Sequence, residues 1–172
     1  MRRRHPPRRW LMTDERQGER LIEAIGRLPP GSGIVFRHYR LPQAERRALF
    51  ERVKAAARRR GLVLLLAGPA AEAASWGADG SHGRGSGFGL RTAPAHDRRG
   101  IRAAERAGAA AVFLSPVFPT RSHPGARALG PARFTMLARR ASLPVIALGG
   151  MNATRARALR GAWGWAGIDA WS

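Results

Sequence analysis

Short apolar runs alternate with longer amphipathic stretches along almost the whole chain of 172 residues. Buried parallel strands are typically short and continuously apolar, and a helix usually connects one to the next. The alternation therefore predicts β-α units around a parallel sheet. We expect strands at 10–13, 34–39, 62–67, 77–83, 90–96, 110–115, 144–148 and 165–171, and helices at 15–28, 42–60, 70–76, 97–109, 132–141 and 152–162.

These strand positions, with helices between them, describe an α/β protein with the (β/α)8 TIM-barrel fold. The chain is shorter than the roughly 200 residues that such barrels usually contain, so we expect a compact barrel. Residues 1–8 form a basic tail in this prediction, and residues 9–172 form one barrel domain. Glycine is frequent and periodicity is lost at 80–89, which predicts a flexible loop and a barrel that could be incomplete around its fourth and fifth strands.

The composition excludes several kinds of site. The chain contains no cysteine, which rules out disulfides, cysteine-ligated zinc, iron–sulfur clusters and thiol nucleophiles. No apolar run approaches the roughly 18 residues of a membrane span. The basic start of the chain is not followed by the apolar segment of a signal peptide. We therefore expect a soluble, cytoplasmic protein with no membrane partner.

The formal net charge is +20, and Lys54 is the only lysine. Such a charge attracts polyanions, so nucleic acid must be considered as a partner. An arginine excess also follows from GC-rich coding, which spreads charge over solvated helix faces. In the helix at 42–60 we expect Ala44 and Val53 to face inward and Arg46 and Arg47 to be solvated. No nucleic-acid-binding motif accompanies the charge, so we expect nucleic acid not to be a partner.

The segment ALGGMN, residues 147–152, ends an apolar strand in two glycines and leads into a helix. Gly149 and Gly150 expose backbone N–H groups and let an anion approach closely, because no Cβ is in the way. Phosphate sites of barrels often follow the seventh and eighth strands. The alternative is an ordinary turn between strand and helix.

The segment SPVFPTRSHPGARALG, residues 115–130, follows the sixth expected strand. It should therefore lie on the same edge of the barrel as ALGGMN. Thr120, Arg121, Ser122 and His123 supply two hydroxyls, a guanidinium and an imidazole, which suit a pyrophosphate group. The alternative is a surface loop with solvated polar side chains.

Together these two segments resemble the thiamine phosphate synthase/TenI family. WLMTDER, IVFRHY, GADGSH and TAPAH resemble further segments of that family, in the same order along the chain. The resemblance implies a (β/α)8 barrel, in agreement with the periodicity. It also implies a Mg²⁺-dependent enzyme of thiamine biosynthesis, which joins a pyrimidine pyrophosphate to a thiazole phosphate and releases pyrophosphate.

The resemblance also implies roles for individual residues. Arg37 matches a basic residue that contacts pyrophosphate, and His123 stands where the family has a lysine, so we assign these two as catalytic. We assign phosphate or substrate binding to Arg37, Thr120, Ser122, Gly149 and Gly150.

Other positions depart from the family pattern. Its asparagine–aspartate pair falls on Ala67 and Gly68, a second aspartate falls near Gly87, and a phosphate-binding serine falls on Asp169. We therefore assign no Mg²⁺ ligands. Two alternatives to the synthase stay open: a thiazole tautomerase, whose histidine position holds Pro116 while His82, His96 and His123 lie on neighbouring segments, and a non-catalytic binder of phosphorylated ligands. Barrels commonly associate, so a homo-oligomer is also possible.

Overall fold

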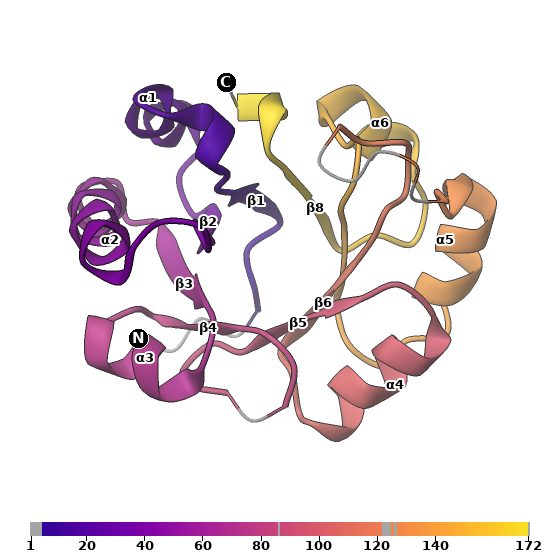
Figure 1. Cartoon of the computed structure of the whole chain (residues 1–172). Helices are drawn as coiled ribbons and strands as arrows, with labels where there is room; N and C mark the ends of the chain where they lie inside the picture. Colours follow the sequence, from indigo (N-terminus) through magenta and orange to yellow (C-terminus); the bar gives the residue numbers. More distant parts are fainter. Residues whose placement is uncertain (1–4, 86, 122–124, 126, 172) are drawn as a thin grey trace.

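The computed structural model describes residues 5–85, 87–121, 125 and 127–171. Eight parallel strands form a closed barrel in chain order, with β8 paired to β1 (Figure 1). This confirms the predicted TIM barrel. The strands are β1 (Arg9–Met12), β2 (Gly33–Phe36), β3 (Val63–Ala67), β4 (Gly80–His82), β5 (Thr92–Ala95), β6 (Ala111–Leu114), β7 (Val145–Ala147) and β8 (Gly164–Gly167).

Helices surround the barrel on its outside (Figure 1). They are α1 (Arg20–Arg27), α2 (Gln43–Arg59), α3 (Ala70–Trp76), α4 (Arg98–Arg106), α5 (Gly130–Ala138) and α6 (Ala153–Ala158), with short 3₁₀ helices η1 (Glu15–Gln17) and η2 (Asp169–Trp171). None of the helices in the described ranges is long and apolar enough to cross a membrane.

Two predicted elements are divided in the structure. The helix expected at 15–28 begins as η1, capped by the Asp14 side chain, and Gly18 at φ 49° separates it from α1. The eighth strand, expected at 165–171, ends at Gly167 because η2 follows it.

Alternation along the strands divides the core into an inner and an outer layer. Trp10 and Met12 point into the barrel, where they pack with Leu65, Phe113 and Ile146. Leu11, between them in β1, packs instead against the helices outside. Trp10 fills the inner space so closely that a Cβ at Gly33 would lie 2.2 Å from its ring. The start of β2 therefore requires glycine.

The barrel closes between β4 and β5, although with little pairing. Among the described residues, His82 and Thr92 form the only strand register pair there. The flexible loop predicted at 80–89 is wrong in part, because residues 80–82 form β4 and the chain then folds back on it. Gly80 makes an antiparallel bridge with Gly89, and the Ser81 N–H donates to the Phe88 carbonyl at 3.1 Å.

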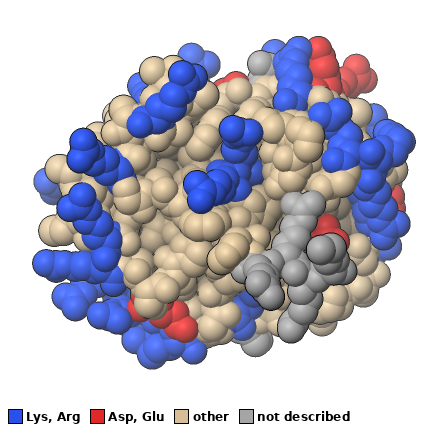
Figure 2. Space-filling view, turned by 180° about the vertical axis from the view of Figure 1, so that it is seen from behind, with Lys and Arg blue, Asp and Glu red and all other residues tan. Residues whose placement is uncertain are grey.

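The inner face of α2 also differs from the expectation. Val53 is buried as predicted, but Ala44 is exposed, while Arg46 and Phe50 are buried. Lys and Arg side chains elsewhere are scattered over the molecule, and the view from behind shows them both along its rim and near its centre (Figure 2). Residues 5–8, which we assigned to a tail, lie against the barrel, because the Trp163 and Trp10 indoles donate to the Pro6 and Pro7 carbonyls.

Candidate active site

A pocket of about 710 Å³ opens at the carboxyl-terminal edge of the strands. It brings together residues that follow four strands: Arg37 after β2, Thr120 after β6, Gly149 and Gly150 after β7, and Asp169 after β8. These include all the predicted site residues that the structure describes. Ser122 and His123 lie outside the described residues, so their predicted roles stay predictions.

The loops after β6 and β7 are bound to each other beneath this pocket. The Val117 N–H donates to the Leu148 carbonyl at 2.9 Å, and the Phe118 N–H donates to the Gly149 carbonyl at 3.1 Å. Gly149 and Gly150 have φ values of 94° and 62°. A Cβ on Gly149 would lie 2.7 Å from Pro116, and one on Gly150 would lie 2.7 Å from the Pro119 carbonyl oxygen. The contact between the loops therefore requires both glycines, whether or not a phosphate also does.

Arg155 connects the same two loops at the wall of the pocket. Its guanidinium donates to the Gly150 carbonyl and lies 4.6 Å from the centre of the Phe118 ring. The Asn152 side chain caps α6 by accepting from the Arg155 N–H at 2.9 Å. Arg121 and Arg127 also line the pocket. The sequence analysis assigned no role to Arg127 or Arg155, since many arginines are scattered along the chain.

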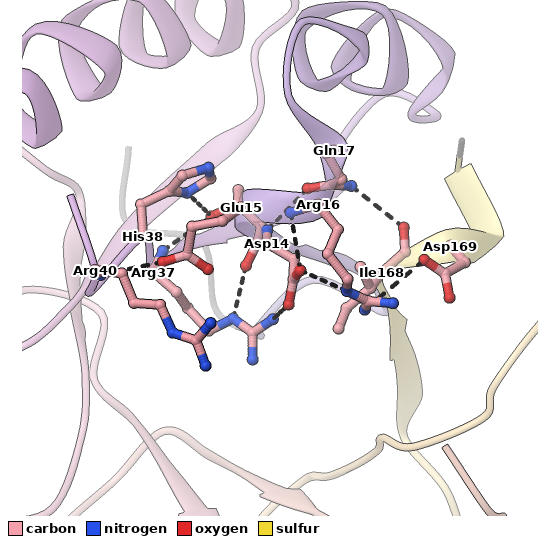
Figure 3. Close-up of polar contacts among 10 residues, drawn as sticks. Asp14, Glu15, Arg16, Gln17, Arg37, His38, Arg40, Ile168 and Asp169 are labelled. Atoms are coloured by element: carbon pink, nitrogen blue, oxygen red, sulfur yellow. Dashed lines mark hydrogen bonds and ion pairs between the residues drawn. The ribbon is translucent and has the colours of Figure 1, made fainter. Parts of the chain in front are cut away.

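Arg37, which lines the pocket after β2, is held in place by its neighbours (Figure 3). Its Nε donates to the Thr13 carbonyl at 2.7 Å, and one terminal nitrogen lies 3.1 Å from an Asp14 carboxylate oxygen. Burial lowers the pKa of Arg37 from its usual value, whereas Asp14 opposes the shift. An arginine remains a cation throughout the physiological range, so this guanidinium presents a fixed positive charge.

Asp14 joins β1 to the end of β8 through Arg16. The Arg16 Nε lies 2.8 Å from Asp14, and a terminal nitrogen of Arg16 lies 4.0 Å from Asp169 (Figure 3). Burial alone would raise the pKa of Asp14. The hydrogen bonds from Arg16 and the charges of Arg16 and Arg37 together lower it by more, so the pKa lies below its usual value. Asp14 and Asp169 are thus both engaged with arginine side chains.

His38 was missed as a site residue by the sequence analysis. It is buried beside Arg37 with φ 47°, a conformation that residues other than glycine seldom adopt. Its Nδ1 is 2.9 Å from the Thr13 hydroxyl, and its ring stacks on Phe36. Burial lowers its pKa, although Glu15 and Asp14 oppose this shift. Strain of this kind concentrates at functional sites, but the residue pattern around His38 carried no sign of it.

A guanidinium lies at the end of β3, where the resemblance places the family's asparagine–aspartate pair on Ala67 and Gly68. Arg46, 8% exposed, donates to the Ala67 carbonyl at 2.9 Å and to the Arg37 carbonyl at 2.9 Å. It also pairs with Glu72 at 3.3 Å. Among the described residues, no three histidine or carboxylate side chains gather in a way that could hold a metal. Because Mg²⁺ prefers oxygen ligands with carboxylates among them, the residues at this place do not fit the ion.

The two described histidines on neighbouring segments have different surroundings. His82 is buried in β4, 2.8 Å from the Thr92 hydroxyl, and burial lowers its pKa to about 4. His96 lines the pocket, and its Nδ1 donates to the Ser115 carbonyl at 2.8 Å. When the ring carries one proton, this bond places that proton on Nδ1 and leaves Nε2 as the acceptor. Of these two, only His96 is placed to act on a ligand in the pocket.

Comparison with known proteins agrees with this architecture. Residues 92–171 match the model of the thiamine monophosphate synthase family. Over 77 residues the chain is 36% identical to a protein of Aquifex aeolicus described as a candidate thiamine-phosphate synthase 2, a match that covers 44% of this chain and 41% of that relative.

Two solved structures share the fold. A thiamine phosphate pyrophosphorylase from Pyrococcus furiosus has a TM-score of 0.77 at 21% identity and covers 96% of this chain and 87% of its own. A 2-keto-3-deoxy-6-phospho-gluconate aldolase from Zymomonas mobilis has a TM-score of 0.61 at 13% identity, over 97% of this chain and 84% of its own. Residues 92–171 are thus similar to the thiamine phosphate synthase/TenI family, and nearly the whole chain shares the fold of the Pyrococcus furiosus protein.

Proposed function

We propose that the pocket binds a thiazole phosphate and a pyrimidine pyrophosphate and that the protein couples them to thiamine phosphate, with release of pyrophosphate. The observation that carries the proposal is the convergence of Arg37, Thr120, Gly149 and Gly150 on one cavity, although they follow three different strands. Their placement matches the roles that the family resemblance implies. We also expect this reaction to take place in the cytoplasm, without nucleic acid as a partner; association into oligomers stays open.

In this reaction the bonds that break and form belong to the substrates, so little covalent chemistry is required of the protein. The bond between the pyrimidine methylene carbon and the pyrophosphate oxygen breaks, the oxygen keeps the electron pair, and the thiazole nitrogen then bonds to the carbon cation. Negative charge develops on pyrophosphate as it leaves, so fixed positive groups accelerate the step by stabilising that charge. Arg37 fits this role because Thr13 and Asp14 hold its guanidinium before any ligand arrives.

Substrate positioning falls to the two loops after β6 and β7. Thr120 offers a hydroxyl at the pocket wall, and the turn at Gly149 and Gly150 lines the pocket with backbone. Because the loops are hydrogen bonded to each other, a phosphate held by one is fixed relative to the other. Such fixed placement of two reactants contributes to the rate by orientation alone.

One observation favours the tautomerase alternative. His96 presents Nε2 as an acceptor in the pocket, and a neutral imidazole of this kind suits removal and return of a proton. Replacing His96 with glutamine distinguishes the two reactions. We expect this variant to retain coupling, whereas a tautomerase that uses His96 would lose its activity.

The proposal is tested by titration calorimetry with thiazole phosphate and pyrimidine pyrophosphate, followed by detection of thiamine phosphate. We expect both ligands to bind and product to form. Thr120→Val should weaken thiazole phosphate binding about tenfold, because a hydrogen bond to a charged group contributes about 1.5 to 3 kcal/mol. Thr154→Val, on the exposed face of α6, is the matched control and should bind normally.

Two results would contradict the proposal. If neither ligand binds, the pocket has been assigned to the wrong substrates. If both bind but no product forms at high protein concentration, the protein is a binder of phosphorylated ligands without synthase activity. Gly150→Val is a poorer test, because the added carbons would also collide with the Pro119 carbonyl.

A further inference from the structure

The charges that line the pocket are strongly unequal. Arg37, Arg121, Arg127 and Arg155 contribute guanidinium groups to its wall, whereas Asp169 contributes the one carboxylate among the described lining residues. In a partly enclosed cavity such an excess is weakly screened and favours an anion of high charge. Inorganic pyrophosphate and organic pyrophosphates are anions of this kind.

The nearby carboxylates are already engaged with arginines. Asp14 pairs with Arg16 and Arg37, and Glu72 pairs with Arg46. Asp169 lies within 4.0 Å of Arg16. A divalent cation would have to displace a guanidinium to reach Asp14 or Glu72, and at the end of β3 it would approach the positive charge of Arg46. These described groups therefore do not fit a metal ion.

Guanidinium groups can stabilise the negative charge of a phosphate group, as a bound metal ion does. Their planar N–H donors match phosphate oxygens in pairs, and they stay charged at every physiological pH. Arg37 is fixed by Thr13 and Asp14, and Arg155 by Gly150 and Phe118. Both line the same pocket, Arg37 after β2 and Arg155 in α6, so a pyrophosphate in the pocket would meet preorganised positive charge.

We propose that this pocket binds the pyrophosphate group directly through its arginines, without a divalent cation. The inference rests on the proposed function, since it concerns the same pocket, but it reverses the metal requirement that the family resemblance implies. Free Mg²⁺ forms a complex with pyrophosphate and lowers its charge. Adding the ion should therefore weaken binding rather than support it.

The test is titration of the protein with inorganic pyrophosphate at moderate salt, once with a chelator and once with excess Mg²⁺. We expect binding in the chelator and weaker apparent affinity with Mg²⁺. Arg127→Ala should weaken binding about tenfold in the chelator, the scale of one charge-assisted hydrogen bond. Arg106→Ala removes the same charge from the exposed end of α4, and it should change affinity less than about twofold.

Three results would overturn the inference of metal-free pyrophosphate binding. Binding that appears only with Mg²⁺ overturns this inference and leaves the proposed function standing. Equal losses in Arg127→Ala and Arg106→Ala would mean general attraction to a basic protein, which also overturns it. Failure of inorganic pyrophosphate to bind overturns it too, and the proposed function falls with it only if thiazole phosphate and pyrimidine pyrophosphate also fail to bind.

Discussion

The two halves of the barrel use their carboxyl-terminal edges differently. In the half from β5 to β8, which the family model matches, Thr120, Arg121, Arg127 and the Gly149–Gly150 turn line the pocket. In the half from β1 to β4, the polar groups of the edge mainly bind one another. Asp14 holds Arg37 there, and Arg46 holds Glu72 and two backbone carbonyls.

Packing does not distinguish the halves. Trp10 of β1 and Phe113 of β6 meet edge to face at 5.3 Å inside the barrel, and both halves have an outer layer of apolar side chains against the helices. The fold is therefore set by the interior, while the chemistry is set by residues that follow the strands. The half from β5 to β8 contains the segments that match the family model, whereas the edge of the half from β1 to β4 is an ion-pair network.

The largest expected effect comes from the glycine turn. Gly149→Ala should lower the free energy of unfolding by more than about 3 kcal/mol, because alanine at φ 94° is strained and its Cβ would collide with Pro116. Urea denaturation measures this loss, and calorimetry should show weakened thiazole phosphate binding, since the two loops would separate.

The control for this variant lies in the other half. Gly26 is exposed in α1, and a Cβ there would have nothing within 4 Å. Gly26→Ala should therefore stabilise the protein by about 0.5 to 1 kcal/mol, the helix preference of alanine over glycine. Equal and small effects of the two variants would mean that the contact between the loops is not needed.

The second-largest expected effect comes from Arg46, in the ion-pair network of the half from β1 to β4. Arg46→Ala removes the partner of Glu72 and the donor to the carbonyls of Arg37 and Ala67. We expect a loss of about 2 to 3 kcal/mol in urea denaturation, because a largely buried carboxylate is left without its cation. Arg47→Ala, which breaks an exposed pair with Glu51, should cost less than about 1 kcal/mol. Similar losses would show that burial of Arg46 matters little.

These variants also mark what the sequence could and could not predict. The strands were found because buried parallel strands are apolar runs, and Thr120 and the glycine turn because their segments are distinctive. Arg46 was placed in solvent, since an arginine in an amphipathic helix usually lies there, and nothing local indicates that its guanidinium reaches Ala67. His38 and Arg155 acquire their roles from contacts with Thr13 and Phe118, which only the folded barrel brings near.

The smallest effect concerns the seam between the halves, where His82 of β4 meets Thr92 of β5. Burial lowers the pKa of His82 from 6.5 to about 4, so the unfolded chain binds a proton between these values and the folded chain does not. Stability should therefore be complete above about pH 7 and should fall as the pH is lowered, by about 1 to 2 kcal/mol at pH 5.

Urea denaturation at pH 7 and pH 5 measures this loss, and His82→Gln should reduce it, because glutamine does not titrate and can still face the Thr92 hydroxyl. The remainder should come from His38, whose pKa burial also lowers. Asp14 and Glu15, with pKa values below their usual ones, contribute only at more acidic pH. An unchanged pH dependence in His82→Gln would mean that His82 takes up its proton without global unfolding, because the weakly paired strands β4 and β5 separate locally at the seam.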